Sequence, residues 1–324
     1  MRKKLLPFFL LLLALCLSGC TAGPTAVENT FDDFIVVGFS QIGAESDWRN
    51  ANTRSMMDAL SEENGYRLIF DDAQQKLDRQ ITAIRNFIHQ GVDYIVLAPS
   101  TENGWDTVLL EAKAAGIPVI IVDRMIKSQD TSLFTSWIGS DFRREGDLAV
   151  AWMEEHLGSG PLRIVHLQGN IGSSAQIGRT AGLDAGLQSN PQWQLVYRNS
   201  GDFTQAKGQE LVESLLAQNI AFDVIFAEND NMAYGAIDAL KNAGLTPGEN
   251  IKIISFDANR AALEMVLSGE IAYDVECNPL HGPRVKAIIE KLEANGATPK
   301  LTYVEESAFD AENTTRELIE SRGY

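Results

Sequence analysis

Three neighbouring residues near the start of the chain, Glu45, Trp48 and Arg49, carry side chains that together could hold a polar ring. The flat indole of Trp48 can pack against C–H groups on the face of such a ring. At the edge of the ring, the Glu45 carboxylate can accept hydrogen bonds and the Arg49 guanidinium can donate them. This chemistry is typical of reversible binding to hydroxyl groups.

The apolar run at residues 34–39, which precedes these three residues, is rich in β-branched side chains and predicts a strand buried on both faces. Ser46 or Asp47 can cap a helix that follows, so the three residues lie where a strand ends and a helix begins. In open α/β sheets, ligands bind at this rim. The alternative is that Trp48 packs beneath the first helix and that Arg49 faces solvent.

Further apolar runs follow along the chain, and several of them end in polar residues. Strands are predicted at residues 66–70, 93–98, 118–122, 133–138, 162–167, 195–199, 223–227, 251–256, 271–275 and 301–304. Helical periodicity fills most of the intervening segments and also predicts helices at residues 280–294 and 313–320. Polar residues stand at or just after strand ends in four places, namely Asp123-Arg124, Asn229, Asp257 and Glu276.

Two stretches of the chain, residues 91–123 and 221–257, share one pattern. Each has an apolar strand, a helix that ends at Ala-Gly, and a second apolar strand that ends in Asp. Repeated β-α units of this length predict two parallel sheets with helices on both faces. Two similar α/β lobes in turn predict a cleft between them.

The last part of the chain does not fit a simple succession of two lobes. It could return to the first lobe and then cross back, which predicts an α/β fold of two doubly wound parallel-sheet lobes joined by a three-strand hinge. The expected N-terminal lobe comprises residues 34–138 and 279–304. The expected C-terminal lobe comprises residues 139–278 and 305–324.

Residues 1–20 read as a targeting segment. Three basic residues at positions 2–4 precede an apolar stretch at residues 5–17 that is too short to span a bilayer comfortably. The segment ends in Leu-Ser-Gly-Cys, which resembles the bacterial lipoprotein signal and implies that Cys20 becomes a diacylated N-terminus. An ordinary signal peptide is the alternative. Residues 21–33 then form a flexible tether to the membrane.

The composition limits the partners of the chain. Its formal net charge of −17 should repel nucleic acid, whereas a neutral ligand is compatible with it. Of the three cysteines, Cys16 and Cys20 belong to the leader and Cys277 stays alone. We therefore expect no disulfide and no cysteine-based metal site.

Signatures of catalysis are missing from the sequence. It contains no nucleophile elbow, zinc signature or phosphate-binding loop, and the glycines around Gly169 and Gly172 lack dinucleotide spacing. Four histidines are isolated from one another: His89, His156, His166 and His281. Carboxylates are plentiful, so paired acids of a glycoside hydrolase stay open as an alternative. We expect a protein without catalytic residues, cofactor or metal.

Taken together, these motifs resemble the type I periplasmic sugar-binding proteins of the ribose and galactose group, and within it the galactofuranose-binding receptors. The resemblance covers nearly all of the chain after the leader. It rests on the stretches Val37 to Gly43, Glu45 to Arg49, Asp72 to Lys76, Ala98-Pro99, Gly104-Trp105, Glu111 to Lys113, Ile117 to Val119, Asp123-Arg124, Leu167 to Gly169, Gly201 to Thr204, Asn229-Asp230, Gly282-Pro283 and Gly323-Tyr324.

The resemblance implies a binding site built from strand ends of both lobes. Its implied members are Glu45, Trp48, Arg49, Asp123 and Arg124 from the first lobe and Arg179, Asn229 and Asp257 from the second, with Glu276 as a further candidate on the hinge side. This set mixes donors and acceptors, which a polyol needs because each hydroxyl donates once and accepts twice.

Each assignment has a structural alternative. Asp123 and Arg124 could form a surface salt bridge, Arg179 could face solvent, and Asn229 could serve only as a helix cap. The chain also departs from the family at the second-lobe rim, where Ala258 replaces a common Gly and Glu228 replaces a His. These departures leave the identity of the bound sugar open.

The resemblance further implies a monomeric, lipid-anchored receptor outside the cytoplasm that delivers a monosaccharide to the permease subunits of an ABC importer. Galactofuranose or a related pentose or hexose is the expected ligand. A sensor that feeds a kinase or chemoreceptor is the main alternative. A transcription repressor would need a helix-turn-helix where the leader stands.

Overall fold

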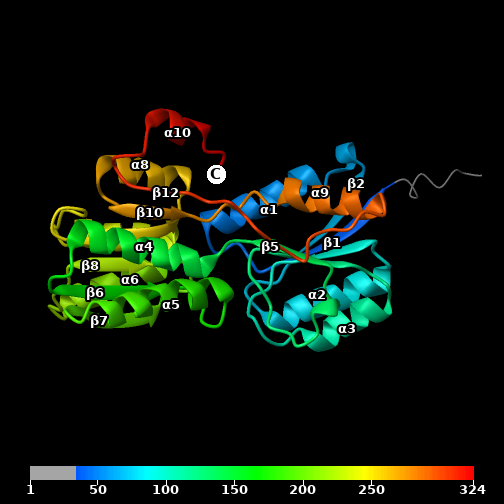
Figure 1. Cartoon of the computed structure of the whole chain (residues 1–324), viewed down its shortest axis with the longest axis horizontal. Helices are drawn as coiled ribbons and strands as arrows, with labels where there is room; N and C mark the ends of the chain where they lie inside the picture. Colours follow the sequence, from blue (N-terminus) through cyan, green and yellow to red (C-terminus); the bar gives the residue numbers. More distant parts are fainter. Residues whose placement is uncertain (1–33) are drawn as a thin grey trace, which may run out of the picture. The chain divides into compact units, whose positions relative to one another are not determined.

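A computed structural model describes residues 34–324 of the chain (Figure 1). The expected leader at residues 1–20, the lipidation of Cys20 and the tether at residues 21–33 lie outside the described residues. Among residues 34–324, no helix has both the length and the apolar character needed to cross a membrane.

The described strands form two six-stranded sheets, whose orders are β11-β5-β4-β3-β1-β2 and β12-β10-β9-β8-β6-β7. The strands are β1 (Ile35–Gln41), β2 (Tyr66–Asp72), β3 (Tyr94–Leu97), β4 (Val119–Val122), β5 (Ser136–Gly139), β6 (Leu162–Gln168), β7 (Trp193–Ser200), β8 (Val224–Ala227), β9 (Lys252–Asp257), β10 (Tyr273–Glu276), β11 (Leu301–Tyr303) and β12 (Ala308–Phe309). Every neighbouring pair among these strands is parallel except β10 and β12. We call the sheet containing β1, with its helices, the first lobe, and the sheet containing β6, with its helices, the second lobe.

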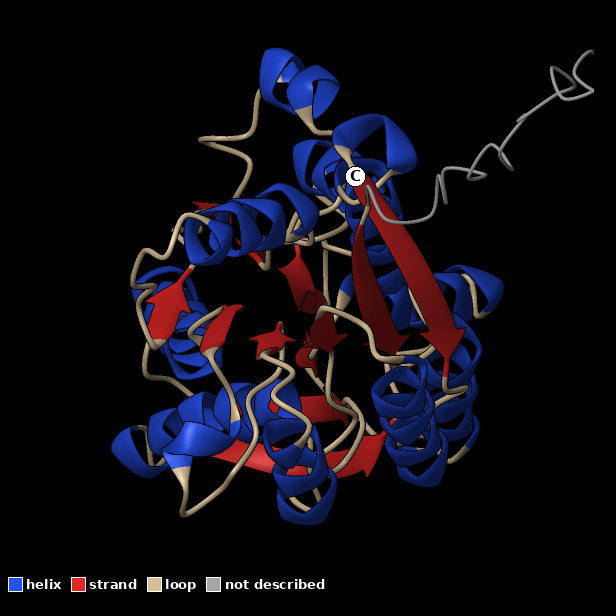
Figure 2. Ribbon diagram, turned by 90° about the vertical axis from the view of Figure 1, so that its right-hand side faces the viewer, coloured by secondary structure: helices blue, strands red, loops and turns tan. Residues whose placement is uncertain are grey.

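Helices cover both faces of each sheet (Figures 1 and 2). They are α1 (Asp47–Ala59), α2 (Leu77–Gln90), α3 (Asp106–Ala114), α4 (Phe142–Leu157), α5 (Ser174–Ser189), α6 (Gln205–Ala217), α7 (Asp230–Asn242), α8 (Arg260–Ser268), α9 (Gly282–Glu293) and α10 (Arg316–Ser321), with short 3-10 turns η1 (Glu62–Asn64) and η2 (Thr131–Leu133). Two parallel-sheet α/β lobes are thus present, which confirms the predicted fold class.

The strands β3, β4 and β8 are apolar at every position because helices cover both faces of their sheets. In β4, Val119 and Ile121 join the core formed with α2 and α3, whereas Ile120 and Val122 join the core formed with α1 and α9. All four side chains are at most 2% exposed. Since successive residues of a strand point to opposite faces, burial on both faces removes the usual alternation of polar and apolar residues.

The chain passes between the two sheets three times. It leaves the first sheet after β5, returns after β10 to form α9 and β11, and leaves again to form β12. Parts of each lobe that are far apart in sequence therefore lie side by side, for example α1 and α9. The same connections bring the carboxyl ends of strands from both sheets toward one another.

Two local predictions were wrong. The strand expected at residues 133–138 begins only at Ser136, because Leu133 closes the 3-10 turn that the Asp130 side chain caps. The sequence reading also missed β12, a two-residue strand that pairs antiparallel with β10. A strand of this length is too short to show a periodic pattern.

Candidate binding site

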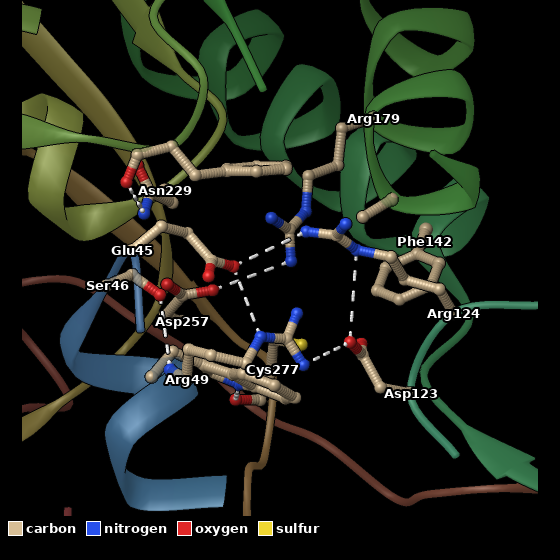
Figure 3. A pocket seen from close by; sticks show the side chains of 13 residues that line it. Glu45, Ser46, Arg49, Asp123, Arg124, Phe142, Arg179, Asn229, Asp257 and Cys277 are labelled. Carbon is tan, nitrogen blue, oxygen red and sulfur yellow. Dashed lines mark hydrogen bonds and ion pairs between the residues drawn. The ribbon is translucent and has the colours of Figure 1, made fainter. Parts of the chain in front are cut away.

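A cavity lies between the two lobes, where strand ends from both sheets meet (Figure 3). Its lining residues are Glu45, Ser46, Trp48, Arg49, Asp123, Arg124, Phe142, Ala175, Arg179, Phe203, Asn229, Asp257 and Cys277. Eight of the nine residues predicted for the site are among them. Most of the lining is therefore polar, although the cavity is deep in the protein.

The ninth predicted residue, Glu276, lies outside this lining. Its carboxylate accepts hydrogen bonds from the Tyr324 hydroxyl at 2.7 Å and from the Ser307 amide at 3.1 Å. It also pairs with the guanidinium of Arg322. The structure thus engages Glu276 with the C-terminal end of the chain.

The start of α1 places the first-lobe residues. The Ser46 hydroxyl accepts a hydrogen bond from the Arg49 amide at 3.1 Å, which caps the helix and fixes the turn that carries Glu45. The indole of Trp48 donates from Nε1 to the carbonyl of Cys277 at 2.6 Å. Trp48 is thereby held between the lobes, with one part of its ring in the cavity wall.

Four charged side chains of the first lobe form one buried group. Arg49 Nε lies 3.1 Å from Glu45 Oε1, and Arg49 Nη1 lies 2.8 Å from Asp123 Oδ2. Arg124 approaches Glu45 and Asp123 only to 3.9 Å. Arg49, Asp123 and Arg124 are each at most 3% exposed, so neither a solvated Arg49 nor a surface salt bridge between Asp123 and Arg124 describes them.

Several atoms of this group lack a hydrogen-bond partner. They are Glu45 Oε2, Arg49 Nη1 and Asp123 Oδ2. Arg49 Nη1 and Asp123 Oδ2 are nevertheless paired by charge at 2.8 Å, so Glu45 Oε2 is the atom of the three that is left without any close partner. Buried polar groups without partners are costly, about 1–3 kcal/mol each, and a polar ligand would relieve that cost.

Arg179 lies in the second lobe and has closer polar partners than Arg124 of the first lobe. Its Nε donates to Glu145 Oε2 at 2.6 Å, its Nη1 donates to the carbonyl of Glu228, and its Nη2 lies 3.6 Å from Asp257 Oδ1. Arg179 is 2% exposed, so it does not face solvent. Figure 3 shows its guanidinium directed at the same space as that of Arg124.

Asn229 combines two roles that the sequence reading treated as alternatives. Its Oδ1 accepts from the Met232 amide at 3.0 Å and so caps α7. Its Nδ2 donates to the carbonyl of Phe203 at 3.1 Å, and the residue still lines the cavity.

Aromatic rings complete the walls. The Arg49 guanidinium lies 4.6 Å from the centre of the Trp48 ring, and the Arg124 guanidinium lies 5.1 Å from that of Phe203. Sequence reasoning did not assign Ser46, Phe142, Ala175, Phe203 or Cys277 to the site. The place of Phe203, three residues beyond the end of β7, is the one signal that could have found it.

Burial and neighbouring charges shift the pKa values of the site. Burial, with the nearby charges of Arg49 and Arg179, lowers the pKa of Arg124 to about 10. Burial acts to lower the pKa of Arg179, but the charges of Glu145, Cys277 and Asp257 and the hydrogen bond to Glu145 together outweigh it, so that this pKa is raised. Burial raises the pKa of Asp257 well above its usual range.

The strand ends of the two lobes share an unusual backbone. Asp123 after β4 has φ of 63°, and Asp257 at the end of β9 has φ of 113°. Positive φ is unfavourable for residues other than glycine and persists only where surrounding structure enforces it. Corresponding strands of the two sheets thus present an aspartate to the cavity from a strained turn.

Comparison with known families gives this geometry a context. Residues 37–280 match the family described as a periplasmic binding protein domain. The chain belongs to this family.

Relatives of the chain are named for the sugars that they bind. The galactofuranose-binding protein YtfQ of Escherichia coli (strain K12) is 37% identical over 292 residues, which are 89% of this chain and 91% of that protein. A crystal structure from Mycobacterium smegmatis in complex with β-D-fucofuranose has a TM-score of 0.83 and 41% identity, covering 86% of this chain and 92% of that one.

A third similar protein is the periplasmic binding component of the arabinose ABC transporter of Shewanella sp. ANA-3, bound to α- and β-L-arabinofuranose. Its TM-score is 0.83 and its identity 40%, with 89% of this chain and 95% of that one covered. Each of the three is named as a binding protein or crystallised with a sugar and none is named as an enzyme, which agrees with the expectation from the sequence.

Proposed function

We propose that the protein is an extracytoplasmic receptor that binds a monosaccharide in the cavity between its lobes and delivers it to an ABC sugar importer. Galactofuranose or a related pentose or hexose is the proposed ligand. Three relatives that are 37–41% identical are named or crystallised with sugars in the five-membered furanose form.

The observation that carries this proposal is the set of buried donors and acceptors around the cavity that keep hydrogen-bonding capacity. Glu45 Oε2, Arg49 Nη1 and Asp123 Oδ2 together offer what a hydroxyl-rich ring requires. These groups converge on one cavity between the lobes, and an interface between domains is a usual place for a small-molecule site.

The proposed sugar contacts are Glu45, Trp48, Arg49, Asp123, Arg124, Arg179, Asn229 and Asp257. In this arrangement the indole supports one face of the ring, and the guanidinium of Arg124 forks over two neighbouring oxygens. Glu276 is left out because its carboxylate is occupied by the C-terminal segment.

The experiment that tests the function is calorimetric titration of the mature protein with L-arabinose, D-galactose, D-fucose, D-ribose, D-fructose and D-glucose. We expect binding of sugars that populate a fitting furanose form, and a co-crystal with electron density for the ring in the cavity. Absence of binding across this set, or a ring bound elsewhere on the protein, would refute the proposal.

The N-terminal segment and the partners belong to the same proposal. We propose that residues 1–20 are removed as a lipoprotein signal, that Cys20 is diacylated, that residues 21–33 are a tether, and that ABC permease subunits receive the sugar from a monomeric receptor. Mass spectrometry of the mature N-terminus, with Cys20→Ala as control, tests the lipid; pulldown of a permease tests the partner.

The lobe boundaries complete the proposal. We propose residues 34–138 with 279–304 as the N-terminal lobe and residues 139–278 with 305–324 as the C-terminal lobe. The membership of β11 in the first sheet and of β12 in the second supports this division.

A further inference from the structure

Two carboxyl groups, Asp230 and Asp274, meet beneath the second-lobe side of the cavity. Asp230 begins α7 directly after Asn229, Asp274 lies within β10, and both are 0% exposed. Asp274 is paired with Ser255 between β10 and β9, and the Ser255 hydroxyl donates to Asp230, so the two carboxyl groups share one buried space within hydrogen-bonding reach. Because two ionised carboxylates can only accept, such a contact requires a proton on one of them.

The remaining hydrogen bonds of Asp230 and Asp274 indicate which carboxyl oxygen carries the proton. Asp230 uses both oxygens, accepting from the Ser255 hydroxyl at 2.7 Å and from the Asn259 amide at 2.9 Å. Asp274 Oδ1 accepts from the Ala258 amide at 3.2 Å, whereas its Oδ2 is buried without any partner. A proton on Asp274 Oδ2 would satisfy this atom and turn the contact with Asp230 into a hydrogen bond.

The pair also holds the turn that presents Asp257 to the cavity. Ala258 and Asn259, whose amides bind the two carboxyl groups, follow Asp257 directly. Asp257 and Ala258 have φ of 113° and 53°, so this turn is strained and needs such restraint.

We propose that Asp230 and Asp274 share one proton, and that the protonated pair positions Asp257 for sugar binding. The inference rests on the proposed function, because it assigns pH dependence to the same site. Asp230 and Asp274 touch no sugar in this arrangement and are positioning residues.

Burial supports the presence of the proton. It raises the pKa of Asp274 to about 7 and, together with the charge of Asp274, raises the pKa of Asp230 well above its usual range. The other titratable or charged groups that face the pair are Tyr234, Asp257, Tyr273 and Arg322. When the pair loses its shared proton as pH rises, repulsion between two buried charges loosens the turn at Ala258.

Thermal unfolding without sugar tests the shared proton. A native pKa above the unfolded value gives stability that is complete below the unfolded pKa and lost as pH rises through the native one. The Tm of the parent protein should therefore fall between about pH 4 and pH 7 through Asp274. Asp274→Asn should remove this contribution and raise the Tm above that of the parent at pH 8.

Matched variants sharpen this test. Asp274→Asn keeps the acceptor for Ala258 and donates to Asp230, whereas Asp230→Asn loses one of two used acceptors and should lower the Tm at every pH. Asp58→Asn removes one charge from an exposed residue and should leave the pH profile unchanged. A parent-like pH profile in Asp274→Asn, or an Asp230→Asn variant as stable as Asp274→Asn, would overturn the shared proton.

Titration with L-arabinose tests the positioning role. From pH 6 to pH 9, affinity should fall about fivefold in the parent protein, whereas Asp274→Asn should keep its pH 6 affinity at pH 9. Equal pH profiles in the two proteins would refute the positioning role. If L-arabinose binds at no pH, both the proposed function and the positioning role are refuted. The unfolding data still test the shared proton independently, because they need no sugar.

Discussion

The two arginines that face the cavity differ in what holds them. Arg179 is bound to Glu145 and to the Glu228 carbonyl, whereas Arg124 has only a long contact of 3.5 Å to the Ser100 carbonyl and two ion pairs at 3.9 Å. Arg179 is therefore expected to stabilise the folded protein in addition to contacting a ligand. Arg124 keeps most of its hydrogen-bonding capacity for the ligand.

This contrast predicts opposite balances of stability and affinity. Arg124→Met should weaken sugar binding at least about tenfold without lowering the free energy of unfolding, because it removes a buried cation beside two others. Arg179→Met should cost about 3–5 kcal/mol of stability, since it strands Glu145. Calorimetry and urea unfolding measure the two quantities, with exposed Arg144→Met as control. Equal effects of both variants on stability would contradict the difference.

Two variants of Trp48 distinguish the contribution of ring stacking from that of its hydrogen bond. Trp48→Phe keeps an aromatic face but loses the bond from Nε1 to the Cys277 carbonyl, and Trp48→Ala loses both. We expect about tenfold weaker sugar binding or more for the Ala variant and a smaller loss for Phe. Titration calorimetry of both variants decides this, and parent-like affinity in Trp48→Ala would remove Trp48 from the proposed site.

Sequence reading reaches polar residues of the site better than apolar ones. Asp123 and Asp257 are conspicuous because a charged residue at the end of a largely apolar strand has no place in a core. Phe142 and Phe203 are not, because an aromatic side chain in a cavity wall has the same sequence signature as one in a core. The hydrogen bond between Glu145 and Arg179 joins two different helices, so no local sequence pattern predicts it.

At the scale of elements, the end of β5 supports the turn at Asp123. Gly139 lies so close that an added Cβ would meet the Asp123 carbonyl oxygen at 2.2 Å and the Trp137 ring at 2.6 Å. The indole of Trp137 also donates to the Asp123 carbonyl at 3.2 Å. This strand therefore fixes the strained backbone that carries Asp123 and Arg124.

Gly139→Ala should displace this turn. We expect a loss of about 1–3 kcal/mol in unfolding free energy from overpacking, and sugar binding weakened about tenfold as Asp123 moves. Gly160→Ala is the matched control, because a Cβ there meets nothing within 4 Å. Chemical unfolding and calorimetry measure both effects. An unchanged affinity in Gly139→Ala would show that the turn does not set the geometry of the site.

Elements were predictable where several physical signals agreed. The strand at residues 118–122 combined β-branched residues, a preceding Gly-Ile-Pro and a following aspartate, and β4 lies there. Where a single signal stood alone it misled, because α1 ends at Ala59, before the glycine typical of a helix stop at position 65, and is followed by the 3-10 turn η1. Gly65 does adopt the left-handed conformation of a stop signal, but it terminates η1.

At the scale of the whole molecule, polar contacts join the rims of the two lobes. The Asp47 amide donates to Asn231 Oδ1 at 3.0 Å, and Asn231 Nδ2 donates to Asp47 Oδ2 at 3.1 Å. The Met125 amide donates to the Ser174 hydroxyl at 2.9 Å. None of these four residues lines the cavity, so they can favour contact between the lobes without touching a ligand.

Asn231→Ala should therefore weaken binding of every sugar by the same factor, about threefold, and leave the ratios between sugars unchanged. Exposed Asn50→Ala, on the same helix as Asp47, is the control. Titration with two sugars of different affinity measures the effect. A change in the ratio of the two affinities would show that Asn231 acts on the ligand and not on the lobes.

The two-lobe architecture followed from the repeat of residues 91–123 at 221–257, because similar units pack in similar ways. How the end of the chain is divided between the sheets depends on pairings that short segments cannot specify alone. The three residues of β11 complete the first sheet, and the two of β12 complete the second.

This late completion has a consequence for biogenesis. The ribosome synthesises the chain from its amino end, so β1 to β5 emerge long before α9 and β11. The first lobe is therefore incomplete until nearly all of the second lobe has been synthesised. The closing residues then finish both halves almost together. A nascent chain stopped just before α9 should accordingly stay open to proteases along its first half.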